Sequence, residues 1–73
     1  MKFDLVFLDP PYDSDFAMNS LKALKDKKLL NNEAIVVVEH KLANDLQNLP
    51  ECYIIKKSRK YGIAYVDILE YRE

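Results

Sequence analysis

The chain has 73 residues, and its 11 Lys and Arg against 12 Asp and Glu leave a formal net charge of −1. This length fits one small domain with a thin core, and the near-neutral charge excludes a protein that attracts nucleic acid through an overall positive field. The single cysteine, Cys52, excludes a secreted fold stapled by intrachain disulfides, so the cytoplasm is the expected location.

Residues 2–8 are predicted to form the first strand. Its apolar side chains fall on both faces, namely Phe3, Leu5, Val6, Phe7 and Leu8. Such a composition is typical of a strand that is covered on both sides. Pro10 and Pro11 end the strand, because proline has no backbone N–H for a sheet ladder. The apolar run is too short for a signal peptide or a membrane span, so no membrane contact is expected.

A helix is predicted next, with Asp13 or Ser14 as the cap of its first turn. Its core-facing residues are Ala17, Leu21 and Leu24. Asn31-Asn32 is predicted to break this helix.

Residues 34–39 are predicted to form a second strand, because the β-branched run of residues 35–38 disfavours a helix. The spacing of Leu42, Leu46 and Leu49 then predicts a short amphipathic helix, which Pro50 ends.

A terminal hairpin is predicted from residues 53–58 and 63–71, joined through Arg59-Lys60-Tyr61-Gly62, where Gly62 supplies a positive φ. The order is then β-α-β-α-β-β, and a right-handed crossover joins the first two strands in parallel. If the sheet keeps growing in one direction, both helices lie on one face and the other face stays uncovered. Such a chain either self-associates or lacks a covering segment.

The segment Asp9-Pro10-Pro11-Tyr12 is the strongest candidate for a catalytic site. It follows a parallel strand, at the edge where open α/β sheets bind their ligands. Its groups suit methylation of a nucleobase amino group, whose lone pair is delocalised into the ring and must be redirected. The Asp9 carboxylate and the Pro10 carbonyl can accept the two amino hydrogens, and Asp9 can stabilise the positive charge that develops on nitrogen.

Tyr12 offers a flat face for the target base, a stacking contact worth about 1–3 kcal/mol. The tandem prolines Pro10 and Pro11 hold these groups in a fixed relation. The alternative is a proline-rich strand exit with a surface carboxylate and no catalytic role.

The stretch Phe3-Asp4-Leu5-Val6-Phe7-Leu8-Asp9-Pro10-Pro11-Tyr12 resembles the motif of amino methyltransferases that depend on S-adenosylmethionine. The resemblance is closest to the bacterial RsmD-type enzymes, which methylate the amino group of one guanine in small-subunit ribosomal RNA. In them a later strand ends in Val-Glu, here Val38-Glu39, and a terminal hairpin lies close to a Tyr-Gly pair, here Tyr61-Gly62. The resemblance covers all 73 residues.

This resemblance implies an α/β fold, the C-terminal half of a Rossmann-like class I methyltransferase domain, with residues 1–73 as its substrate-side part. The last strand would insert antiparallel between its two neighbours in a mixed, mostly parallel sheet. The N-terminal half, with the glycine-rich loop for S-adenosylmethionine, would be absent, so the chain alone is expected to be inactive. The first strand would be an open edge, and we expect a homodimer of this chain.

Two other functions remain open. A DNA adenine-amino methyltransferase shares the Asp-Pro-Pro-Tyr segment for the same chemical reason, although the compact hairpin ending leaves no room for a separate DNA-recognition domain. The chain could instead be a non-catalytic module that self-associates through its uncovered face.

The basic cluster of the hairpin is a candidate RNA contact or a solvated hairpin end. It comprises Lys56, Lys57, Arg59 and Lys60, beside Tyr61. In the complete enzyme its partner would be ribosomal RNA of the small subunit.

The remaining polar and aromatic residues are given structural roles. Glu39 and His40 are expected in a loop or a helix cap, and a chain with one His and one Cys, without ligand spacing, is predicted to hold no metal. Cys52 is expected to be unreactive. Three tyrosines are expected to fill strand surfaces, namely Tyr53, Tyr65 and Tyr71.

Overall fold

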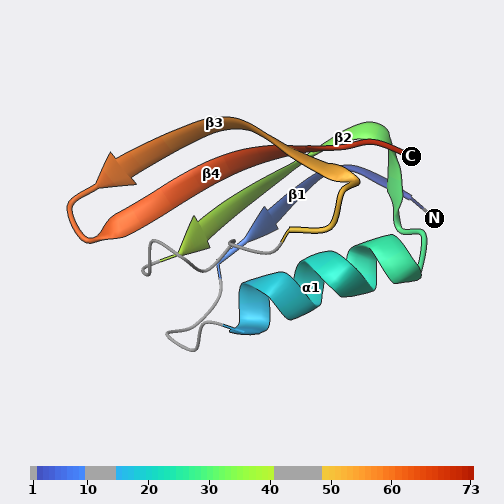
Figure 1. Ribbon diagram of the computed structural model, residues 1–73, viewed down its shortest axis with the longest axis horizontal. Helices are drawn as coiled ribbons and strands as arrows, with labels where there is room; N and C mark the ends of the chain where they lie inside the picture. The colour runs from blue at the N-terminus through green and yellow to red at the C-terminus, as the bar shows by residue number, and fades with distance from the viewer. Residues whose placement is uncertain (1, 10–14, 41–48) are drawn as a thin grey trace.

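A mixed sheet with one helix on one face makes up the part of the chain that the computed structural model describes, residues 2–9, 15–40 and 49–73 (Figure 1). Its elements are β1 (Phe3–Leu8), α1 (Asp15–Asp26), β2 (Leu30–His40), β3 (Tyr53–Tyr61) and β4 (Ala64–Tyr71). The strands lie in the order β1-β2-β4-β3. The helix predicted around Leu42 and Leu46 falls outside the described residues, so the described order is β-α-β-β-β.

The last strand, β4, lies between β2 and β3 and is antiparallel to both. This is the insertion that the family resemblance implies. Only β1 and β2 form a parallel pair, with Leu5 opposite Ile35 and Leu8 opposite Val38. β1, β2 and β3 run the same way and only the inserted β4 runs in the opposite direction, so the sheet is mixed, as expected.

The helix ends and the second strand begins earlier in the chain than the sequence predicted. α1 ends at Asp26, and β2 already contains Asn31-Asn32. Leu30 is buried and pairs with Phe3, which draws this segment into the sheet. The Asn31 side chain then donates a hydrogen bond to the Asp4 carboxylate at 2.8 Å. A tertiary contact thus satisfies an amide that would otherwise favour a turn.

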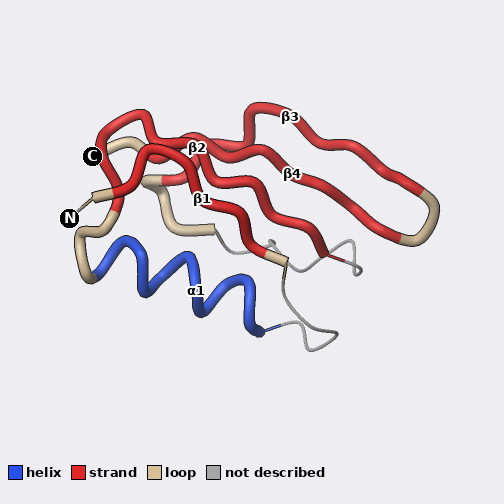
Figure 2. Tube along the Cα trace, turned by 180° about the vertical axis from the view of Figure 1, so that it is seen from behind, coloured by secondary structure: helices blue, strands red, loops and turns tan. Residues whose placement is uncertain are grey.

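The hairpin turn is also shorter than predicted. Arg59, Lys60 and Tyr61 belong to β3, and only Gly62 and Ile63 form the turn. Gly62 has a φ of +58°, which confirms the positive φ predicted for it. The hairpin therefore extends beyond the ends of β1 and β2 as a paired ribbon (Figures 1 and 2).

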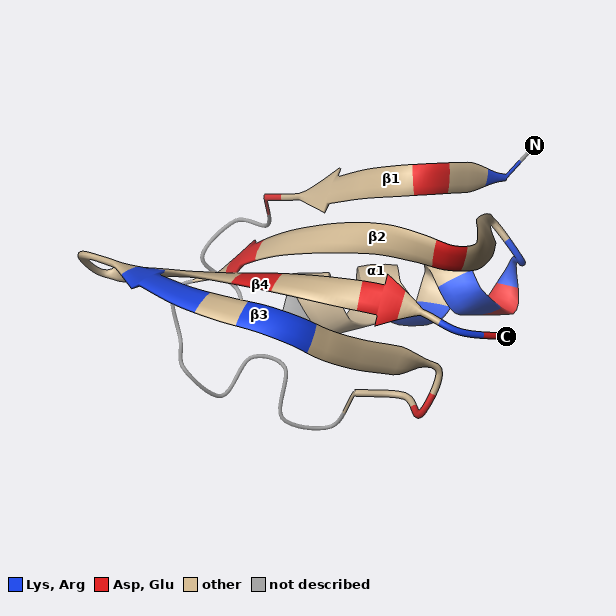
Figure 3. Ribbon diagram, turned by 90° about the horizontal axis from the view of Figure 1, so that it is seen from above, with Lys and Arg blue, Asp and Glu red and all other residues tan. Residues whose placement is uncertain are grey.

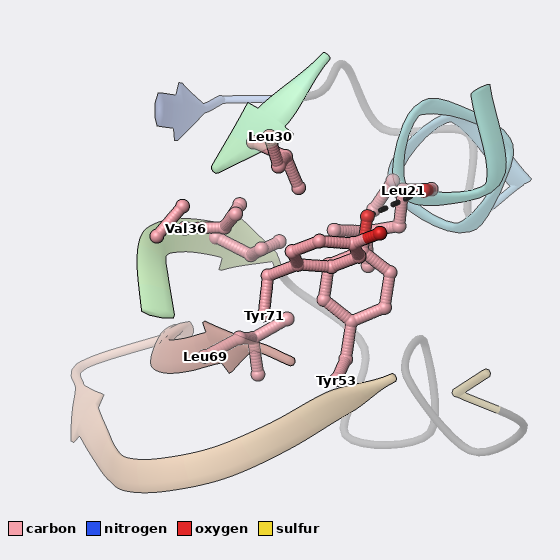
Figure 4. Packing of buried hydrophobic residues seen from close by; sticks show 9 residues of the cluster. Leu21, Leu30, Val36, Tyr53, Leu69 and Tyr71 are labelled. Atoms are coloured by element: carbon pink, nitrogen blue, oxygen red, sulfur yellow. Dashed lines mark hydrogen bonds between the residues drawn. The ribbon is translucent and has the colours of Figure 1, made fainter. Parts of the chain in front are cut away.

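The core lies between α1 and the sheet (Figure 4). From the helix, Ala17 and Leu21 are buried and Leu24 packs against them, which confirms the predicted helix face. The sheet contributes Val36, Val38, Tyr53, Leu69 and Tyr71. The Tyr53 hydroxyl donates a hydrogen bond of 2.6 Å to the Leu21 carbonyl, and burial raises the pKa of this phenol. The only described helix is therefore fixed to the sheet by both packing and a buried hydrogen bond.

No described helix or loop covers the opposite face of the sheet (Figure 1). On β1, Phe3, Leu5 and Phe7 are 43%, 54% and 71% exposed. The prediction of a β1 buried on both faces is therefore wrong for this chain, whereas the predicted bare face is confirmed for the described residues. β1 pairs with β2 alone and so forms one edge of the sheet, as expected. Among the described residues no helix has the length and apolar character to cross a membrane.

Candidate nucleobase-amine and nucleic-acid site

Asp9 lies directly after β1, at the carboxyl end of the parallel strand pair, and its side chain is exposed. β1 ends at Leu8, one residue before a proline pair that has no backbone N–H groups with which to extend a ladder. Pro10, Pro11 and Tyr12, the other members of the predicted catalytic segment, lie outside the described residues. The structure therefore places the carboxylate of the predicted site at the edge where α/β sheets bind ligands.

Glu39 lies on the neighbouring strand, β2, close to the level of Asp9. Leu8 is opposite Val38 on strands that are about 4.8 Å apart, so this register directs the next residues, Asp9 and Glu39, to neighbouring positions. Glu39 is exposed and belongs to β2, not to the loop or cap predicted for it. Two acidic residues thus mark one end of the sheet on neighbouring strands.

His40 and Asp67 form a buried pair next to this edge. The His40 Nε2 atom lies 2.6 Å from the Asp67 carboxylate, and the two residues are 4% and 7% exposed. The Tyr65 ring stacks on His40 at 5.5 Å and 17°, and the Lys60 ammonium lies 5.6 Å from the Tyr65 ring centroid. His40 is therefore a core residue that joins β2 to β4, and the predicted loop or cap role is wrong.

Asp67 has no role in the sequence prediction, although the sequence contains a signal for it. Asp67, Leu69 and Tyr71 are every second residue of β4, so Asp67 lies on the same face as the other two, and this face is buried. A carboxylate on a buried face requires a partner. The partner, His40, is 27 positions away, so only the strand order brings the two together.

The basic cluster lies in β3, an edge strand, and forms a stripe of positive charge along the length of this strand (Figure 3). The Lys56 ammonium is 3.7 Å from the Glu70 carboxylate, which also accepts hydrogen bonds from Arg72. These hydrogen bonds, helped by the Arg72 and Lys56 charges, hold the pKa of the Glu70 carboxyl below its ordinary value. Part of the cluster is therefore engaged within the sheet.

Among the residues that the structure describes, Cys52 and a cluster of metal ligands would be the further candidates for reactive groups. Burial, the largest effect, raises the pKa of the Cys52 thiol, which disfavours the nucleophilic thiolate. In the ranges that the structure describes, no three His, Cys, Asp or Glu side chains gather as metal ligands.

The described residues do not fit the binding of a nucleotide-like methyl donor by a glycine cradle. The only glycine of the chain is Gly62, in the hairpin turn. A Cβ atom added to Gly62 would have no heavy atom within 4 Å, so no close backbone approach depends on it. Its positive φ serves the turn and not a ligand.

Comparison with known proteins identifies relatives of this chain. The family profile described as conserved hypothetical protein 95 matches residues 1–70. The uncharacterized methylase RP545 of Rickettsia prowazekii is 35% identical over 69 residues, which cover 94% of this chain and 29% of that protein.

Solved structures of similar proteins share the fold. HI0767 of Haemophilus influenzae, provisionally described as a methylase, superposes with a TM-score of 0.87 at 30% identity, covering 97% of this chain and 44% of that one. A conserved hypothetical protein of Streptococcus pyogenes gives 0.79 at 33% identity, with the same two coverages, 97% and 44%. YhhF of Escherichia coli gives 0.84 at 23% identity and shares the fold. The chain thus spans less than half the length of each of these relatives.

Proposed function

Because the chain belongs to the methyltransferase family described as conserved hypothetical protein 95, the RsmD-type family that its sequence resembles, we propose that it is the substrate-side part of an amino methyltransferase. The proposed substrate is the exocyclic amino group of a guanine in small-subunit ribosomal RNA. The proposed methyl donor is S-adenosylmethionine, held by a part of the enzyme other than this chain.

Asp9 carries the proposed chemistry of this chain. Its carboxylate accepts a hydrogen from the amino group and favours the geometry in which the nitrogen lone pair points out of the ring system. It also stabilises the positive charge that develops on nitrogen as the methyl group is transferred. Pro10 supplies the second acceptor through its carbonyl, and Tyr12 supplies the stacking face.

The observation that supports this function is the position of Asp9. An exposed carboxylate directly after a parallel strand, beside Glu39 on the next strand, provides acceptors for an amino group at the ligand-binding edge of the sheet. The buried pair His40 and Asp67 fixes β2 to β4 one residue further on, so the acidic edge rests on a rigid support.

A chimera provides the test of the reaction. The segment of HI0767 that matches this chain is replaced by residues 1–73, and the product is incubated with tritiated S-adenosylmethionine and either ribosomal RNA or duplex DNA. We expect methylated guanine in the RNA and no label in the DNA. Label in adenine of the DNA would instead favour the DNA adenine-amino methyltransferase, and no label in either, from a folded chimera, would refute the proposal.

Titration of S-adenosylmethionine into the purified 73-residue chain is expected to give no binding heat. The reason is the lack of a glycine cradle, since Gly62 is committed to the hairpin turn. Isothermal titration calorimetry makes the measurement, with the chimera as the positive control. Micromolar binding by the chain alone would show that the glycine-rich half is dispensable.

The uncovered face supports a second proposal, in which the isolated chain self-associates as a homodimer. Leu5, Phe7 and Ile54 share this face, and all three are more than 40% exposed. Light scattering is expected to give twice the 8.6 kDa mass at high concentration, and Phe7→Lys should shift it toward one chain. A single chain mass for the unsubstituted protein would contradict this proposal.

A further inference from the structure

The side chains of β3 divide between the two faces of the sheet. Lys57 is opposite Ile68, Arg59 opposite Val66 and Tyr61 opposite Ala64, which places all three on the uncovered face. Ser58 and Lys60 are opposite Asp67 and Tyr65 and so share the face of α1. Lys56 occupies the irregularity between Ile55 and Lys57. One strand therefore presents two different surfaces.

Only the uncovered side of β3 offers cations that the described sheet does not already engage. Lys56 pairs with Glu70, and Lys60 lies over the Tyr65 ring. No hydrogen bond or ion pair joins the head group of Lys57 or Arg59 to another described residue, and both side chains are exposed.

The aromatic residues divide in the same way. His40 stacks on the Tyr65 ring and Lys60 lies over it, so Tyr65 is engaged within the protein. Tyr61 is 64% exposed, next to the turn of the projecting hairpin. Tyr61 is thus the aromatic side chain of this strand that a ligand can stack on.

We propose that Lys57, Arg59 and Tyr61 form a binding strip for single-stranded RNA, in which the two cations bind phosphates and Tyr61 stacks on a base. A basic track with an aromatic platform is the combination that binds single strands with little dependence on sequence. Alternate residues of a strand are about 6.6 Å apart, which suits neighbouring phosphates of an extended chain. The choice of RNA over DNA rests on the proposed function, whereas the strip itself does not.

The strip lies across the sheet from the proposed amine site. Glu39, Val66 and Arg59 form one row of the pairing, and Asp9, directly after β1, follows the pair of Leu8 with Val38 and so lies next to this row. Three strand spacings separate Arg59 from Asp9, which is about 14 Å. The base on Tyr61 is therefore a few nucleotides from the methylated one. Acidic groups at one end of the row suit an amine, and cations at the other end suit phosphates.

Fluorescence anisotropy of a labelled, unstructured RNA oligonucleotide with the full 73-residue chain tests the strip. Lys57→Ala combined with Arg59→Ala is expected to weaken binding at least tenfold and to lower the slope of log K against log salt by about 1.4, from about 0.7 per lost phosphate contact. Tyr61→Ala is expected to weaken binding by roughly tenfold, and Tyr61→Phe, which keeps the ring, to leave it unchanged.

Lys22→Ala combined with Lys27→Ala is the matched control, because it removes the same charge from exposed positions on and next to α1. The strip is refuted if this control weakens binding as much as the β3 variant does. It is also refuted if polyglutamate displaces the RNA at equal charge concentration, which would mark a surface for any anion. Circular dichroism of each variant confirms that the fold is intact.

The strip and the proposed function can fail separately, because the binding assay contains no methyl donor. Normal binding by the chain together with an inactive chimera would refute the methyltransferase role and keep the strip. Methylation of ribosomal RNA with an unchanged KM in the Lys57→Ala, Arg59→Ala chimera would refute the strip and keep the reaction.

Discussion

Asp9→Asn in the chimeric methylase is expected to lower kcat for ribosomal RNA by about 10²–10³-fold, the loss typical of one preorganised electrostatic contact to the transition state. The substitution keeps the shape of the side chain and one acceptor oxygen, but it removes the charge that stabilises the developing positive nitrogen. Because Asp9 is exposed and follows β1, the change is expected to leave the fold intact. Single-turnover methylation measures the effect without the contribution of product release.

Asp26→Asn is the control for this experiment. Asp26 is also exposed, but it is the last residue of α1 and lies at the opposite end of the sheet from Asp9 (Figure 1). The Asp26→Asn chimera should methylate ribosomal RNA at the same rate as the unsubstituted chimera. An Asp9→Asn enzyme that methylates at the same rate would leave the proline-rich strand exit as the explanation of the segment.

Asp67→Ala is expected to have the largest effect on stability. It removes the carboxylate from a hydrogen bond of 2.6 Å while the His40 ring stays buried. The cost is about 1–3 kcal/mol, the penalty typical of a buried polar group that loses one hydrogen-bond partner. A chain of this size has a free energy of unfolding of only about 4–11 kcal/mol. Urea unfolding followed by circular dichroism measures the loss.

Asp4→Ala tests whether burial is the cause. Asp4 also accepts one side-chain hydrogen bond within the sheet, from Asn31 at 2.8 Å, but that pair is exposed. Its substitution should change the free energy of unfolding by less than about 0.5 kcal/mol. A double-mutant cycle of Asp67→Ala with His40→Ala measures the coupling energy between these two residues. Equal losses in the free energy of unfolding for Asp4→Ala and Asp67→Ala would show that burial does not make the His40 and Asp67 pair more stabilising.

The sequence predicts those features of this fold that depend on local patterns. The short apolar and β-branched runs locate the first two strands, the spacing of Ala17 and Leu21 locates the buried face of α1, and Gly62 marks the hairpin turn. The uncovered face also follows from the sequence, because the handedness of the crossover implies it once the sheet grows in one direction. Asp9 was located in the same way, from the prolines that end β1.

Features that depend on contacts between distant residues were missed. Asn31-Asn32 looks like a helix break, yet the buried Leu30 and the bond to Asp4 hold it in β2. His40 looks like a loop residue until β4 brings Asp67 beside it. The insertion of β4 came from the family resemblance, since no pattern within the strands specifies their order.

The central place of β4 has a consequence for how this protein folds as it is synthesised. Although β3 precedes β4 in the chain, it has no neighbour in the sheet except β4, and β2 meets this hairpin only through β4. While the ribosome is still adding residues 64–71, the parallel pair and β3 cannot join, and both have unpaired backbone groups. The four-stranded sheet cannot form until β4, the inner strand that joins β2 to β3, has been synthesised. Folding therefore depends on contacts far apart in sequence and proceeds slowly. During that interval a chaperone that binds extended apolar segments has two open edges to protect.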